Sequence, residues 1–193
     1  MLVAALGDSI TAGSPGWDPD PTVRAQIRDP EPESQYEHWA ALGDERLRFR
    51  NCGIYGQRTD EIARRLDECA AGADVLIVQG GINDIAQGRP VEPAAENLRA
   101  MVERGRALGK GILIADVLPW NNGYPAAEQP IRRLNELIRE LGAPLLPFHD
   151  TLEDPDRPGR MREEWTSDGD HPSVDGYRRL GEVVAESIAV LSD

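Results

Sequence analysis

The chain has 193 residues, of which 40% are hydrophobic and 28% are charged. This balance is typical of a soluble globular protein, and we expect one domain over residues 1–193. The formal net charge of −13 argues against nucleic acid and anionic membrane surfaces as partners, because both are polyanions. No run approaches the roughly 18 apolar residues of a membrane span, so we expect no membrane insertion. No basic-then-apolar leader opens the chain, which favours a cytoplasmic location unless a leader has been removed. The oligomeric state stays open.

The chain contains two cysteines, Cys52 and Cys69. Two thiols are too few for a four-thiolate zinc site or for a disulfide framework. Because both lie in segments with an apolar pattern, we predict two buried free thiols.

Five short runs, four of them rich in Val, Ile or Leu, are typical of strands buried on both faces of a parallel sheet. They cover residues 2–6, 48–52, 75–79, 112–117 and 144–148. Helical periodicity separates them. Thr59, Pro130 and Ser173 are expected at helix starts, and Leu98 and Met101 belong to a further helix. The alternation predicts an α/β fold, a three-layer α/β/α sandwich around a five-stranded parallel sheet, with sites at the carboxyl ends of the strands.

Two stretches interrupt the alternation. Residues 13–34 are rich in Pro, Asp, Glu and Gly, and a short helix over residues 35–42 is expected to follow with Ser34 as its cap. Residues 150–170 are also irregular and charged. Both loops approach the predicted site edge, and long loops in compact domains are often functional.

Polar segments fall at this edge and carry the groups that acyl transfer needs. That reaction uses a nucleophile, a base, a group that orients the base, and donors for the oxyanion. Ser9 follows the first strand and supplies a hydroxyl. His171 precedes the last helix, and Asp168, three residues earlier, can reach one imidazole nitrogen while the other faces the serine. Asn83 offers an amide N–H, and Gly53 lets its backbone approach a substrate closely.

These segments resemble the GDSL family, also called SGNH hydrolases after a Ser, a Gly, an Asn and a His in four blocks. Here the four are Ser9, Gly53, Asn83 and His171, in the family's order. The combination of Gly-Asp-Ser, Gly-x-Asn-Asp and Asp-x-x-His-Pro makes the resemblance specific. Ile10 stands where the family usually has Leu, and the insertion after Thr11 is unusual, so the resemblance says least about the substrate.

The resemblance implies a flavodoxin-like sheet order and neither a metal nor another cofactor. It also implies Ser9 as nucleophile, with Asp168 and His171 completing a catalytic triad. The oxyanion hole would consist of the Ser9 N–H, the Gly53 N–H and the Asn83 side chain. A competing interpretation, in which Asp168, Asp170 and His171 bind a metal ion, is disfavoured because it leaves Ser9 and Asn83 without roles.

Trp120, Asn121 and Trp165 are candidate substrate-binding residues. Trp120 and Asn121 follow the fourth strand, while Trp165, like Trp17, lies in a long loop. Ring faces and amides suit a sugar-bearing ester, although packing within the loops would explain them equally well. No long apolar helix suggests an acyl tunnel. We therefore expect hydrolysis of a small ester with a short acyl group, such as an acetylated carbohydrate. The alternatives are a lysophospholipase or thioesterase acting on longer chains, an acyltransferase, and a catalytically silent carbohydrate-binding protein.

Overall fold

The structure is a computed structural model and describes residues 1–13, 15–16, 20–26 and 31–191. Trp17 lies outside the described residues. Within them, none of the helices combines the length and the apolar character that crossing a membrane requires.

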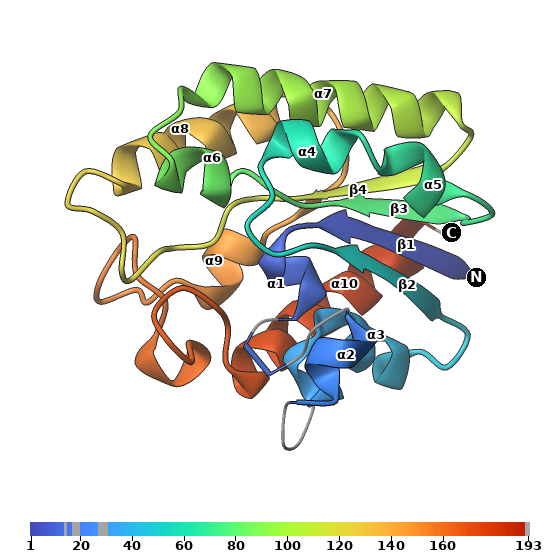
Figure 1. Cartoon of the computed structure of the whole chain (residues 1–193), viewed down its shortest axis with the longest axis horizontal. Coiled ribbons are helices and arrows are strands. Elements are labelled where there is room, and N and C mark those ends of the chain that lie inside the picture. Colours follow the sequence, from blue (N-terminus) through green and yellow to red (C-terminus); the bar gives the residue numbers. More distant parts are fainter. Residues whose placement is uncertain (14, 17–19, 27–30, 192–193) are drawn as a thin grey trace.

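A five-stranded sheet forms the middle layer of the molecule (Figure 1). Its strand order is β2-β1-β3-β4-β5, and every neighbouring pair is parallel. The predicted α/β fold is therefore confirmed. The strands are β1 (Leu2–Gly7), β2 (Arg48–Gly53), β3 (Val75–Val78), β4 (Gly111–Ala115) and β5 (Leu145–Leu146). The register places Gly7 beside Gly53 and Leu6 beside Val78, so the carboxyl ends of β1, β2 and β3 lie together.

Helices cover both faces of the sheet (Figure 1). One face carries α4 (Thr59–Ala63), α5 (Leu66–Ala70), α6 (Ile82–Ala86), α7 (Val91–Ala107) and α8 (Glu128–Arg139). The other carries α1 (Ser9–Ala12), α3 (Tyr36–Gly43), α9 (Phe148–Leu152) and α10 (Val174–Leu191). Successive residues of a strand point to opposite faces. Ala4 and Leu6 of β1 accordingly join one core, whereas Val3 and Ala5 join the other.

The fifth strand is shorter than predicted. Only Leu145 and Leu146 pair with β4, and Phe148 begins α9 instead of ending a strand. Pro144 and Pro147 flank the pair, and a proline has no N–H to give to a sheet ladder. The other four strands agree with the prediction to within two residues at each end.

Of the predicted helix starts, that at Ser173 is confirmed. Its hydroxyl accepts a hydrogen bond from the Gly176 N–H in the first turn of α10. Thr59 is not the cap of α4 but its first residue, after Arg58. The helix containing Pro130 begins two residues earlier, at Glu128, since proline is tolerated in a first helical turn.

The stretch over residues 13–34 contains α2 (Pro21–Arg24) and a 3-10 turn, η1 (Pro32–Ser34), among its described residues. The helix expected after it is α3. Its cap is Gln35 and not Ser34, since the Ser34 hydroxyl donates to Glu31 instead.

Cys52 and Cys69 form a disulfide bond, so the prediction of two free thiols is wrong. Cys52 lies near the end of β2 and Cys69 lies in α5. Their Cα atoms are 6.1 Å apart, although 17 positions separate them in the sequence. The apolar pattern indicated burial correctly for Cys69, but only the path of the chain through α4 and α5 brings the two sulfurs together.

Candidate functional site

Ser9 is the first residue of α1 and follows the turn that ends β1. The preceding residue, Asp8, caps this helix, and its Oδ1 accepts the Ile10 N–H at 3.0 Å. The Asp8 N–H donates to Gln79 Oε1 at 3.1 Å. An N–H at the first helical position has no intrahelical acceptor, so the Ser9 N–H remains available. The turn thus presents a hydroxyl and a backbone donor from one residue, which is only 8% exposed.

The structure brings Ser9, His171 and Asp168 together. Ser9 Oγ lies 3.0 Å from His171 Nε2, although 162 positions separate the two residues. His171 Nδ1 lies 2.8 Å from Asp168 Oδ2. The other carboxylate oxygen of Asp168 accepts the backbone N–H groups of Asp170 and His171. The carboxylate therefore holds both the ring and the backbone of the histidine in place.

Polar side chains that follow β4 hold the loop carrying Asp168 and His171. Trp120 Nε1 donates to Asp170 Oδ1 at 2.6 Å, and Asn122 Nδ2 donates to the Asp168 carbonyl at 2.6 Å. Gly169 has φ of 86°, a backbone conformation that suits glycine. Its carbonyl accepts the Asn121 N–H. The loop thus docks on the chain after β4 through hydrogen bonds and not through a sheet ladder.

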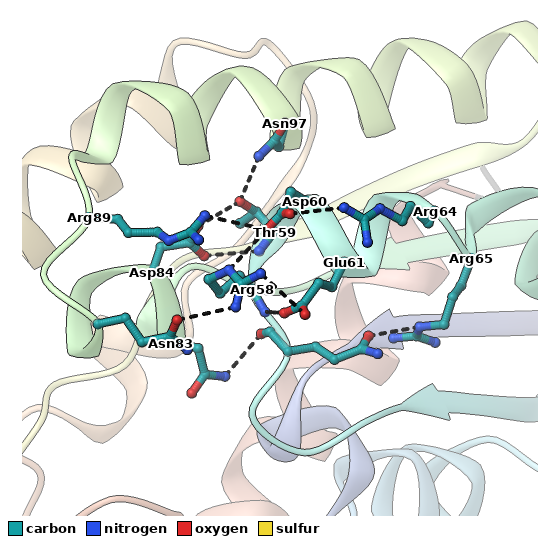
Figure 2. Close-up of polar contacts among 12 residues, drawn as sticks. Arg58, Thr59, Asp60, Glu61, Arg64, Arg65, Asn83, Asp84, Arg89 and Asn97 are labelled. Atoms are coloured by element: carbon teal, nitrogen blue, oxygen red, sulfur yellow. Dashed lines mark hydrogen bonds and ion pairs between the residues drawn. The ribbon is translucent and has the colours of Figure 1, made fainter.

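Asn83 lies in the first turn of α6, just beyond β3. Its Nδ2 donates to the Gln57 carbonyl at 3.0 Å (Figure 2), and the second proton of that amide has no acceptor among the described residues. The neighbouring Asp84 has a different role. Its two oxygens accept the Thr59 N–H and the Thr59 hydroxyl. Asp84 therefore anchors the start of α4, which is a structural role.

Gly53 does not offer a free N–H. Its N–H donates to Asn51 Oδ1 at 2.8 Å. A Cβ at Gly53 would lie 2.1 Å from the backbone nitrogen of Ala12, so this position needs glycine for the close packing of β2 against α1. The expectation of an oxyanion donor at Gly53 disagrees with this geometry.

Gly56, three residues further along the same loop, is a glycine that the sequence interpretation did not single out. It is exposed, with φ of 70°, and nothing lies within 4 Å of the place where a Cβ would be. It directly precedes Gln57, whose carbonyl contacts Asn83. The Gly56 N–H has no hydrogen-bond acceptor among the described residues. The repeated glycine in Asn51-Cys52-Gly53-Ile54-Tyr55-Gly56 was the available signal, but spacing alone does not say which N–H is occupied.

Trp120, Asn121 and Trp165 lie in three different settings. Trp120 and Asp170 line a small hollow. In the sequence, two further lining residues, Ile10 and Ile82, adjoin Ser9 and Asn83. The other lining residues are Gln79, Val117, Leu118 and Pro119. Both polar atoms of the Asn121 side chain bond the Met161 backbone. The guanidinium groups of Arg162 and Arg179 lie over the ring of Trp165. Only Trp120 therefore borders an opening beside the triad, whereas Asn121 and Trp165 hold loops together.

One metal-ligand cluster occurs among the described residues. His149, Asp150 and Glu153 place one ligand atom each within 4.8 Å of one another. None of the three is a residue expected to take part in catalysis. The arrangement at Ser9 instead joins a hydroxyl, an imidazole and a carboxylate in the order that nucleophilic acyl transfer uses.

Comparisons with known proteins identify the family and the fold. Residues 5–179 match the model of the GDSL-like lipase/acylhydrolase family, which is most of the chain. A comparison with curated proteins gives no significant match.

Solved structures share the fold at low sequence identity. A protein assigned to the G-D-S-L lipolytic family from Desulfitobacterium hafniense DCB-2 superimposes with a TM-score of 0.79 at 23% identity, covering 96% of this chain and 98% of its own. A member of that family from Veillonella parvula DSM 2008 gives 0.77 at 20%, covering 96% and 97%. The lipase/acylhydrolase from Enterococcus faecalis gives 0.71 at 22%, covering 98% and 96%. Since the family match spans nearly the whole chain, this protein belongs to the GDSL-like lipase/acylhydrolase family.

Proposed function

We propose that this acylhydrolase cleaves carboxylic esters with small, short-chain acyl groups through an acyl-enzyme on Ser9. The observation that carries the proposal is the continuous contact from Ser9 Oγ to His171 Nε2 at 3.0 Å and from His171 Nδ1 to Asp168 Oδ2 at 2.8 Å. The imidazole can take the hydroxyl proton while the carboxylate stabilises the imidazolium that forms.

In the proposed reaction, Ser9 Oγ bonds to the ester carbonyl carbon as its proton passes to His171 Nε2. The tetrahedral intermediate then expels the alcohol, which takes the proton from His171. Water then attacks the acyl-enzyme as its proton passes to His171 Nε2. The second tetrahedral intermediate releases the acid, and His171 returns the proton to Ser9 Oγ. Donors placed for the developing oxyanion stabilise both intermediates.

Three donors are proposed for that oxyanion: the Ser9 N–H, the Asn83 amide and the Gly56 N–H. Gly56 replaces Gly53 in this assignment because the Gly53 N–H is held by Asn51 Oδ1. The carbonyl of Gln57 accepts from Asn83, and this contact joins the loop that carries Gly56 to the start of α6.

The hollow beside the triad supports a short acyl group. Its apolar lining comes largely from the segments after β3 and β4, and its cavity volume of about 10 Å³ is room for about one water molecule, which favours a small acyl group over a long one. The hydrogen bond between Trp120 and Asp170 lies at this hollow. Trp120 also offers an aromatic ring, which would suit an acetylated carbohydrate.

The test is turnover of p-nitrophenyl acetate by the wild type and by Ser9→Ala. We expect Ser9→Ala to fold normally, to lose measurable turnover, and to resist a fluorophosphonate probe that labels the wild type. Turnover retained by Ser9→Ala would remove Ser9 as nucleophile. A wild type that neither turns over esters nor reacts with the probe would point to a silent binding protein.

The substrate class requires a second experiment, a series of p-nitrophenyl esters from C2 to C8 together with acetylated sugars. The proposal expects the highest kcat/KM at C2 or C4. Rates that rise to C8 would favour a lysophospholipase or thioesterase instead. Transfer of the acyl group to an added alcohol in preference to water would indicate an acyltransferase.

A further inference from the structure

Arg65 lies between α4 and α5, beside the residues that carry the proposed oxyanion donors. Its Nη1 donates to the Cys52 carbonyl at 2.6 Å, and its Nη2 donates to the Gly7 carbonyl at 3.1 Å. Its Nε donates to Gln57 Oε1 at 2.8 Å (Figure 2). One half-buried guanidinium thus bonds Gly7 at the end of β1, Cys52 near the end of β2, and Gln57 in the loop after β2.

Each of these partners leads to a proposed oxyanion donor. Gly7 lies two residues before Ser9. Cys52 and Gln57 flank the loop that carries Gly56. The carbonyl of the same Gln57 accepts the amide of Asn83, which follows β3 (Figure 2). Arg65 therefore connects the ends of β1 and β2 directly, and the end of β3 through Gln57.

The Cys52 carbonyl belongs to the same peptide unit as the Gly53 N–H. That N–H donates to Asn51 Oδ1, and Asn51 Nδ2 donates to the Thr11 carbonyl in α1. A hydrogen bond from a cation to a carbonyl polarises the whole peptide unit and strengthens the bond that its N–H makes. The contact of Arg65 with Cys52 thereby also tightens the attachment of the β2 end to the helix that begins with Ser9.

Backbone bonds join the strand ends as far as the Ile54 N–H, which donates to the Gly7 carbonyl, and Gly56 lies two residues beyond that contact. Oxyanion donors act only when they stand within about 2.7–3.1 Å of the developing charge, and a displacement of about 1 Å can lower a rate by about 100-fold. A planar guanidinium with donors in a fixed fork suits this task better than a flexible ammonium. We propose that Arg65 is a positioning residue that sets the oxyanion donors of the three loops relative to one another; this inference rests on the proposed function.

Arg50 provides a matched control. Its Nη1 donates to the carbonyls of Cys69 and Ala71 at the end of α5. Arg50 and Arg65 line the same hollow beside the Cys52–Cys69 disulfide. Arg50, however, bonds none of the loops that carry the proposed donors. A purely structural role would therefore give the two arginines similar effects.

The experiment compares Arg65→Met, Arg65→Lys and Arg50→Met with the wild type, by p-nitrophenyl acetate kinetics and by Tm. Arg65→Met should lower kcat by about 10- to 100-fold and leave KM within about 3-fold, because the donors act on the transition state. Arg65→Lys should keep the charge but recover only part of kcat. Arg50→Met should change kcat by less than about 2-fold, even if its Tm falls as far as that of Arg65→Met.

If Arg65→Met does not fold, Gln57→Leu serves in its place, because it removes one of the three acceptors of Arg65. It should lower kcat by about 3- to 10-fold with Tm close to that of the wild type. The inference is overturned if a folded Arg65→Met or Gln57→Leu keeps the kcat of Arg50→Met, or if its loss appears in KM alone. A wild type without turnover and without fluorophosphonate labelling overturns the proposed function as well, so the two failures are distinguishable.

Discussion

The two sides of the candidate site are built differently. The nucleophile side consists of the ends of three adjacent strands. Arg65 and the Cys52–Cys69 disulfide join these strand ends to α5. The base side is a loop between a 3-10 turn, η2 (Glu163–Trp165), and α10. Hydrogen bonds from Trp120 and Asn122 dock this loop. The difference indicates that the core sets the position of the nucleophile, whereas exposed polar contacts set the position of the base.

Two aspartates near Ser9 make the contrast concrete. Asp8, on the nucleophile side, is fully buried, and its Oδ2 has no hydrogen-bond partner among the described residues. Burial raises its pKa to about 6, against the lowering effect of hydrogen bonds from Ile10 and Gln79 and of the His171 charge. Partial burial also acts to raise the pKa of Asp168, but hydrogen bonds from His171 and Asp170 lower it overall. The side chain of Asp168 is 41% exposed. One carboxyl thus holds its proton up to about pH 6, whereas the other stays ionised to lower pH beside an imidazole.

The largest effect is expected on the base side, from Asp168→Asn. The amide keeps the shape of the side chain but cannot stabilise a protonated His171, and it favours the wrong tautomer of the ring. We expect kcat for p-nitrophenyl acetate to fall by about 10³- to 10⁴-fold. Asp170→Asn is the control, since Asp170 contacts Trp120 and not the ring; it should stay within about 3-fold. Equal losses in the two variants would contradict the assignment of Asp168.

On the nucleophile side, Asn83→Ala removes one proposed oxyanion donor. We expect kcat to fall by about 10²- to 10³-fold with little change in KM. Asn97→Ala is the matched control, because Asn97 donates to the Thr59 hydroxyl at 3.0 Å within the same polar network (Figure 2). Asn97→Ala should affect Tm and not kcat. An unchanged kcat in Asn83→Ala would take Asn83 out of the mechanism.

Removing the disulfide tests the covalent tie on the nucleophile side. Replacing Cys52 and Cys69 together by Ala should lower the free energy of unfolding by about 3 kcal/mol, as expected for a bond that closes a loop of this length. Denaturant unfolding measures this loss. Ellman titration of the unreduced, unfolded wild type should find no free thiol, and two thiols would contradict the bond.

Disulfides persist mainly in oxidising compartments. The test is to lyse native cells in the presence of an alkylating agent and to ask whether the Cys52–Cys69 disulfide is found. Its presence would argue for export of the chain, against the cytoplasmic location expected from the sequence.

The smallest effect concerns the pH dependence of stability. Folded Asp8 holds its proton up to about pH 6, whereas the unfolded chain releases it near 3.8. The wild type should therefore lose stability as pH rises from about 4 to about 6, and no further above that. Two pKa units correspond to about 3 kcal/mol.

Asp8→Asn should lack this loss when unfolding free energies are compared across that range. Asp44→Asn is the control with the opposite sign, because hydrogen bonds from Arg46 lower the pKa of Asp44 to about 2. The contribution of Asp44 is present above its ordinary value of 3.8 and disappears as pH falls towards 2. If the unfolding free energies of the wild type and Asp8→Asn change in parallel between pH 4 and 6, Asp8 is already ionised in the folded protein over that range.

Sequence reasoning was most reliable where one local pattern decides the outcome. Short apolar runs predicted β1, β3 and β4, because strands buried on both faces exclude polar residues. It was less reliable where a side chain had a choice of partners. Thr59 could have capped its own helix, but its hydroxyl donates to Asp84 in a distant segment. Gly53 and Gly56 look alike in the sequence, yet only Gly53 has its N–H taken up by Asn51.

The amino-acid sequence by itself determined the alternation of strands and helices, and with it the position of Ser9, Asn83 and His171 next to element ends. Periodicity and turn chemistry are local properties, so they can be read without knowing which strands are neighbours. The family resemblance, and not a local pattern, implied the sheet order in which β1 lies between β2 and β3. Only the tertiary structure decided that Cys52 meets Cys69. The same holds for Arg65, whose guanidinium reaches two strand ends at once. Those features depend on contacts between segments far apart in the chain, which no local pattern encodes.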